Sequence, residues 1–62
     1  MKHWSVTFEV FLGNSKNGKE LKVIDVEAGT KKLAAIRAMT LINKMEGYEN
    51  LFKQVMKVEE VA

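Results

Sequence analysis

The fold is decided by one stretch near the N-terminus, Trp4-Ser5-Val6-Thr7-Phe8-Glu9-Val10-Phe11-Leu12. Apolar and polar residues alternate along it, and the apolar row consists of Trp4, Val6, Phe8, Val10 and Leu12. This period of two, built from aromatic and β-branched residues, is typical of a strand with one buried face. We therefore predict a central strand over His3–Leu12, with a helix packed on the face that carries Phe8.

Three further elements are predicted to follow this strand. The polar, glycine-containing stretch Gly13–Lys19 is typical of a hairpin loop, and it leads into a second strand over Glu20–Ala28. A helix is predicted over Lys31–Glu46, with Thr30 as its N-cap. A third strand is predicted over Phe52–Val61. Its poor alternation and its lysines are typical of an edge strand.

One face of the predicted helix is apolar and rich in alanine. Its members recur at helical spacing: Ala34, Ala35, Ala38, Leu41, Ile42 and Met45. Leu33 and Ile36 lie off this stripe, so they are either surface residues or covered by something else. In the third strand, Met56 and Val58 are predicted to point inward.

The pairing of the first two strands is predicted from the apolar pattern. A two-residue turn at Asn17-Gly18 would place Phe8 opposite Glu27, which sets a core side chain against a charge. A three-residue loop, Lys16-Asn17-Gly18, shifts the pairing by one residue and places Phe8 opposite Val26. Because a one-residue slip moves a whole row of side chains to the wrong face, we predict the three-residue loop.

The direction of the elements predicts the topology. The second strand and the third strand both run opposite to the first, so the sheet order is 2-1-3 with the most apolar strand in the middle. A right-handed crossover through the helix joins the two outer strands. The prediction is a single α+β domain over residues 1–62, β-β-α-β, with a three-stranded antiparallel sheet and one helix packed on one face.

Length and composition exclude several classes of protein. A chain of 62 residues buries only about 60% of the surface that its unfolded form exposes, so self-association is a plausible source of extra stability. There is no Cys and one His, which excludes a disulfide and a thiolate metal site. No apolar run approaches the roughly 20 residues that cross a bilayer. We expect a soluble cytoplasmic protein without a membrane partner.

The sequence contains no arrangement typical of an enzyme. Ser5 and Ser15 have no local His and acid around them, and Gly13 and Gly18 flank a hairpin loop instead of opening a helix after a strand. We predict no catalytic residue, no metal site, no cofactor and no small-molecule substrate. The expectation is a non-enzymatic binding or regulatory module.

The sheet face opposite the helix is the predicted binding surface. The predicted pairing places Phe11 opposite Val23, with Leu21 diagonal to them and Val55 nearby on the third strand. One helix covers one face of the sheet, so these residues would form an exposed apolar patch, which indicates a contact with another protein. We predict a homodimer, or docking of another protein, through this face.

A second hypothesis is binding of nucleic acid. The net charge of +2, from ten Lys and Arg against eight Asp and Glu, is too weak to imply such a partner alone. The candidate contacts lie on the hairpin, the helix and the third strand: Lys16, Lys19, Arg37, Lys44 and Lys53. Glu20, Glu46 and Glu49 lie at the same end of the predicted fold and dilute the positive field.

Overall fold

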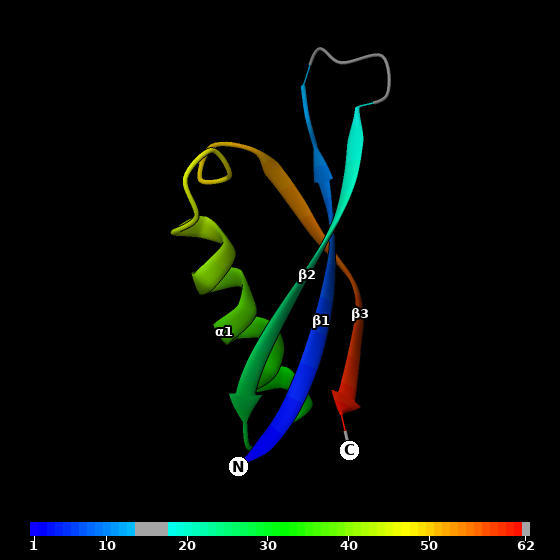
Figure 1. Cartoon of the computed structure of the whole chain (residues 1–62), viewed down its shortest axis with the longest axis vertical. Coiled ribbons are helices and arrows are strands. Elements are labelled where there is room, and N and C mark those ends of the chain that lie inside the picture. The colour runs from blue at the N-terminus through cyan, green and yellow to red at the C-terminus, as the bar shows by residue number, and fades with distance from the viewer. Residues whose placement is uncertain (14–17, 62) are drawn as a thin grey trace.

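A computed structural model describes residues 1–13 and 18–61 of the chain. Three strands and one helix follow one another: β1 (Lys2–Phe11), β2 (Lys19–Ala28), α1 (Lys31–Asn43) and β3 (Phe52–Val61). The strands form an antiparallel sheet in the order β2-β1-β3, and α1 packs on one face of it (Figure 1). The predicted α+β fold and its strand order are confirmed.

The core lies between α1 and the face of the sheet that carries the alternating row of β1. Val6, Phe8 and Val10 are completely buried, and Trp4 is nearly so. The indole nitrogen Nε1 of Trp4 donates a buried hydrogen bond of 3.0 Å to the carbonyl of Ala28. Because of this bond, burying the Trp4 ring in the core leaves its polar atom with a hydrogen-bond partner.

The helix begins where the sequence predicts and ends earlier. The Thr30 hydroxyl accepts a hydrogen bond of 3.2 Å from the backbone N–H of Leu33, which makes Thr30 the N-cap. The helix ends at Asn43 and not at Glu46, and successive turns carry the chain to β3. Ala34, Ala38 and Ile42 of the predicted apolar stripe are buried, whereas Ala35 is half-buried and Leu41 is 45% exposed.

The predicted pairing of β1 with β2 is wrong by four residues. Val26 lies opposite Trp4 and not opposite Phe8. The chain has to leave the sheet after Ala28 to form the N-cap of α1, and the predicted pairing would have set Trp4 opposite Thr30, beyond the strand. Because the displacement is an even number of residues, every side chain of β1 and β2 keeps the face that was predicted for it.

The hairpin that joins β1 to β2 is longer than predicted. The backbone N–H of Leu12 donates to the carbonyl of Gly18 over 2.7 Å, so the connection spans residues 13–17. The predicted three-residue loop would have included Gly18, which instead closes the ladder. Lys16 and Asn17, on which that prediction also depended, lie outside the described residues.

An irregularity in the pairing of β1 with β3 corrects the predicted orientation of β3. Thr7 pairs with Lys57 and Phe8 pairs with Val55, so Met56 is an extra residue between them, as in a β-bulge. Met56 is therefore 51% exposed and not inward as predicted. Val58 is partly buried against the core, as predicted.

Candidate functional site

The face of the sheet opposite α1 carries exposed apolar side chains. Because directly opposite residues share a face, Phe11, Leu21, Val23 and Phe52 all point away from the helix. Leu21 is 67% exposed and Phe52 is 66% exposed, and Val23 is also exposed. We call these four residues the outer patch. Three of them were predicted from the sequence, but the predicted pair of Phe11 with Val23 is wrong, because Phe11 lies opposite Lys19 and Val23 lies opposite Thr7.

The fourth predicted member, Val55, does not belong to this surface. Val55 lies opposite Phe8 and therefore points to the helix side of the sheet. The prediction is wrong because the bulge at Met56 moves the residues before it to the opposite face. Phe52 takes the place of Val55 in the outer patch. Its sequence signal was an aromatic residue at the start of β3, where it could pair across strands with Phe11.

The aromatic end of the outer patch is built by contacts between three strands. The rings of Phe11 and Phe52 have centroids 5.2 Å apart and planes inclined at 57°. Lys19 Nζ lies 5.5 Å from the centre of the Phe11 ring and 4.0 Å from a carboxylate oxygen of Glu9. The patch thus combines a paired aromatic surface with one cation and one anion at its rim.

The residues predicted to bind nucleic acid do not gather on one surface. Lys19 lies on the outer face beside Phe11, whereas Lys53 lies opposite Val10 on the helix side, where its Nζ donates to the carbonyl of Tyr48. Nη1 of Arg37 donates to the carbonyl of Glu27 over 2.8 Å.

Two basic candidates remain. Lys44 is exposed just after α1, and Lys16 lies outside the described residues. Nucleic-acid binding stays a prediction that no gathering of these side chains supports.

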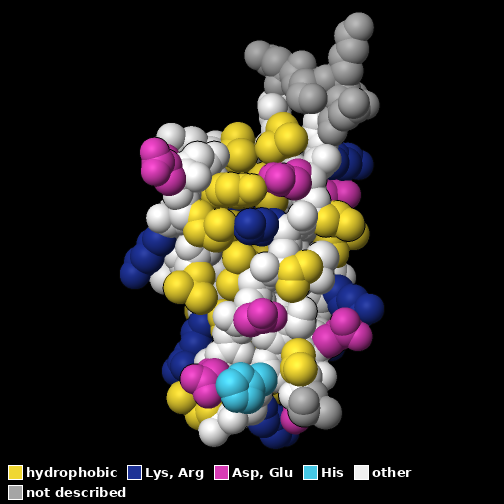
Figure 2. Space-filling model, in the orientation of Figure 1, with side chains coloured by type: hydrophobic (Ala, Val, Ile, Leu, Met, Phe, Trp, Pro, Cys, Tyr) yellow, Lys and Arg dark blue, Asp and Glu magenta, His cyan; other side chains and the backbone are white. Residues whose placement is uncertain are grey.

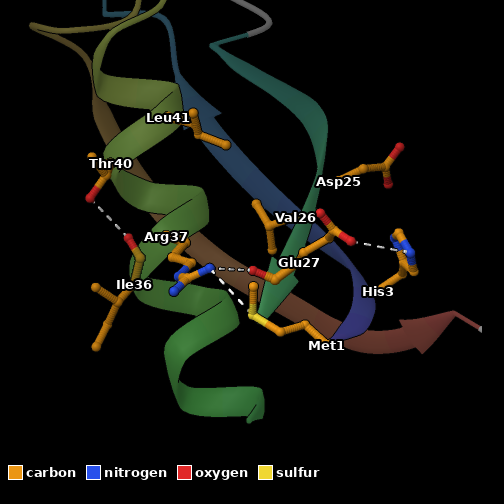
Figure 3. A pocket seen from close by; sticks show the side chains of 9 residues that line it. All are labelled: Met1, His3, Asp25, Val26, Glu27, Ile36, Arg37, Thr40 and Leu41. Atoms are coloured by element: carbon orange, nitrogen blue, oxygen red, sulfur yellow. Dashed lines mark hydrogen bonds and ion pairs between the residues drawn. The ribbon is translucent and has the colours of Figure 1, made fainter. Parts of the chain in front are cut away.

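A second surface feature, which the sequence did not predict, lies between α1 and β2. It is a groove of about 570 Å³ with Val26 and Leu41 facing each other across it and Met1 and Arg37 at one end. Figure 3 shows the Leu41 side chain directed from α1 toward the sheet, while Asp25 points away from the helix. The feature depends on where α1 sits over the sheet, which periodicity alone does not specify.

The acidic side of this groove lies on the outer margin of β2. His3 Nε2 is 3.5 Å from a carboxylate oxygen of Glu27, and both side chains are exposed. In Figure 2, hydrophobic side chains lie along the molecule between α1 and the sheet, and acidic side chains lie next to the histidine. The groove is thus apolar inside and acidic along one lip.

Titratable contacts in the described part of the chain are few. Tyr48 donates a hydrogen bond of 2.9 Å to a carboxylate oxygen of Glu20. This bond, together with local desolvation and the carboxylate charge, raises the pKa of Tyr48 above its ordinary value of 10.0.

Among residues 1–13 and 18–61, no group of three or more His, Cys, Asp or Glu side chains could hold a metal ion. No helix in the same ranges is long and apolar enough to span a membrane.

Comparison with known protein families, with curated proteins and with solved structures gives no match.

Proposed function

We propose that this protein is a non-enzymatic binding module that associates with a second copy of itself through the outer patch. The observation that carries the proposal is that Phe11, Leu21, Val23 and Phe52 share one sheet face, over which no helix of the described part of the chain lies. Monomeric proteins expose single apolar side chains commonly but large contiguous patches rarely. Two such faces packed together would form a second core of the kind found between stacked sheets.

The size of the chain favours a second copy as the occupant. With 62 residues and no Cys, the domain has one small core and no covalent cross-link. Fully burying one Leu, Val or Phe side chain stabilises by about 1.5–3 kcal/mol, and a symmetric pair buries the outer patch twice. Association costs about 4–15 kcal/mol in lost freedom of movement. The two contributions are similar in size, so we expect a dimer that dissociates on dilution.

The experiment compares two acidic substitutions in the outer patch with one elsewhere. Leu21→Asp and Phe52→Asp place a charge where two copies would meet, whereas Leu33→Asp makes the same kind of change on the exposed surface of α1. Light scattering coupled to size-exclusion chromatography would measure the mass at several concentrations. Circular dichroism would check that each variant is folded.

The expected result is a concentration-dependent mass in the parent and in Leu33→Asp, and a monomer mass in both patch variants. A parent that stays monomeric at every concentration contradicts self-association. In that case, capture of a different protein by the parent and not by Phe52→Asp would assign the patch to another partner.

A further inference from the structure

Among the described residues, β2 pairs with another strand on one side only, where it meets β1. The carbonyl of Gly18 accepts a bond from β1, so the even-numbered residues of β2 direct their backbone groups to β1. The odd-numbered residues Leu21, Val23 and Asp25 then direct their N–H and C=O groups outward. Glu27 continues this pattern, and its outward carbonyl accepts a bond from Arg37. The edge between Leu21 and Asp25 therefore offers a row of donors and acceptors to another strand.

The two edges of the sheet differ in how they are protected. The pairing of β3 with β1 is interrupted by the extra residue Met56, a feature that discourages regular pairing with a further strand. The pairing of β2 with β1 runs without interruption from Lys19 to Ala28. Regular strand addition is therefore easier at β2 than at β3.

The groove lies directly beside this edge. Val26 forms its sheet side and Leu41 its helix side, within a volume of about 570 Å³ (Figure 3). A strand added to β2 would direct every second side chain into this space, on the same side of the sheet as Val26. Those side chains would meet an apolar surface, so the groove selects apolar residues at alternate positions.

The other side chains of an added strand would face the acidic lip. Asp25 and Glu27 project from the outer side of β2, with His3 beside the Glu27 carboxylate, while Arg37 lies at one end of the groove and donates to the Glu27 carbonyl. Opposite charges on directly opposed residues stabilise a strand pair, and like charges destabilise it. The complementary strand therefore alternates apolar residues with basic ones.

A second copy of β2 does not meet both requirements. Antiparallel pairing that sets Val26 against Val26 of the copy would bring Asp25 opposite Glu27, two like charges. Antiparallel pairing that sets Lys19 opposite Glu27 would put Glu20 of the copy beside Val26, a charge in the apolar groove. The pattern of β2 thus fits a different sequence better than its own.

From these observations we infer that the β2 edge and the adjoining groove bind an extended peptide segment of another protein, in which apolar and basic residues alternate. The peptide adds a fourth strand antiparallel to β2, with its apolar side chains beneath Leu41 and its basic side chains beside Asp25 and Glu27. Backbone hydrogen bonds supply affinity, and the groove and the acidic lip supply specificity. The groove lies on the helix side of the sheet and the outer patch on the other face, but Leu21 and Val23 belong to both the β2 edge and the outer patch, so peptide binding is measured on the monomer.

The probe is a fluorescently labelled peptide that alternates Lys and Val over about eight residues, the length of an ordinary strand. Its binding is measured by fluorescence anisotropy, with a Glu–Val peptide for comparison. The inference expects saturable binding of the Lys–Val peptide and at least about tenfold weaker binding of the Glu–Val peptide. No saturation by the Lys–Val peptide up to about 1 mM overturns the inference.

Backbone methylation of the peptide tests strand addition itself. The Lys residues lie opposite the outward-facing residues of β2, so their N–H groups point to β2, whereas the Val N–H groups point away. Methylation of the Lys backbone nitrogens should weaken binding at least about tenfold, because several hydrogen bonds are lost. Methylation of the Val backbone nitrogens should change the affinity of the peptide by less than about twofold. Equal loss with both peptides contradicts pairing at this edge.

A matched pair of protein variants tests the acidic lip. The double variant D25K/E27K should weaken the Lys–Val peptide about tenfold, while E59K/E60K, with the same charge change on β3, should have little effect. Equal effects of the two variants would show binding by net charge alone and overturn the inference. Because Asp25 and Glu27 point to the same face as Leu21 and Val23, both variants are compared with the parent at concentrations where all three have the monomer mass.

Discussion

The two faces of the sheet carry similar side chains in opposite surroundings. On the helix side, Val6, Phe8 and Val10 are fully buried, whereas on the other side Leu21 and Phe52 are about two-thirds exposed. The difference arises from coverage, because α1 lies over one face only. Apolar alternation therefore indicates which residues share a face, and the position of the helix decides which face becomes the core.

The largest effect is expected from a truncation on the covered face. Phe8→Ala removes a completely buried ring from the centre of β1. We expect a loss of about 3–5 kcal/mol in the free energy of unfolding, because the ring contributes both transfer energy and packing. Urea denaturation followed by circular dichroism measures this loss. A loss similar to that of an exposed residue would contradict the assignment of Phe8 to the core.

Replacing one ring on the covered face by a smaller one should have a smaller effect on the free energy of unfolding. Trp4→Phe keeps an aromatic ring but removes the N–H that donates to the buried Ala28 carbonyl. Loss of one hydrogen bond costs about 0.5–1.5 kcal/mol, and the smaller ring also leaves part of the core unfilled. Thermal unfolding should record a fall of roughly 4–8 °C for each kcal/mol in a domain of this size. An unchanged midpoint would indicate that the hydrogen bond contributes nothing to stability.

The bulge in β3 gives a sharper comparison of the faces within one strand. Val55→Asp places a charge on the helix side and should destabilise the monomer by about 1–2 kcal/mol. Phe52→Asp places the same charge on the outer face, where it removes the ring contact with Phe11, and should destabilise the monomer by about 0.2–1 kcal/mol. Urea denaturation at low protein concentration compares the two. The reverse order would show that the bulge does not place these residues on opposite faces.

The smallest expected effect on stability comes from a change at Tyr48, in the segment between α1 and β3. Tyr48 is held to β2 by its bond to Glu20, which raises its pKa in the folded state. The stability that comes from this bond is complete below the unfolded pKa of about 10 and is lost as the pH rises through the higher folded pKa. Tyr48→Phe should therefore show a smaller fall in stability than the parent at alkaline pH. Thermal unfolding across this pH range provides the measurement, and parallel curves would contradict the assignment.

The sequence predicts the faces of the sheet better than its pairing. The alternation around Phe8 fixes which residues are buried, and the strand order follows from the direction of the elements. A shift by an even number of residues keeps every side chain on its face, so alternation cannot distinguish Val26 opposite Phe8 from Val26 opposite Trp4. The indole bond of Trp4 and the start of α1 make that distinction in the folded chain.

The candidate sites were predictable only in part for related reasons. The outer patch follows from alternation in β1 and β2, but its member on β3 depends on the bulge at Met56, which no local pattern marks. The groove depends on the spacing of α1 from β2, with Leu41 left at the margin of the helix contact. Such features arise from packing between elements and not from the period within one element.

The central claim is that the outer patch of one copy contacts the outer patch of another. Nuclear Overhauser effects between copies, recorded on a mixture of isotopically labelled and unlabelled protein, test this contact directly. We predict effects from the Phe52 ring of one copy to the methyl groups of Leu21 and Val23 of the other. Effects confined to Leu33 and Ile36 on α1, or no effects between copies at high concentration, would contradict the claim.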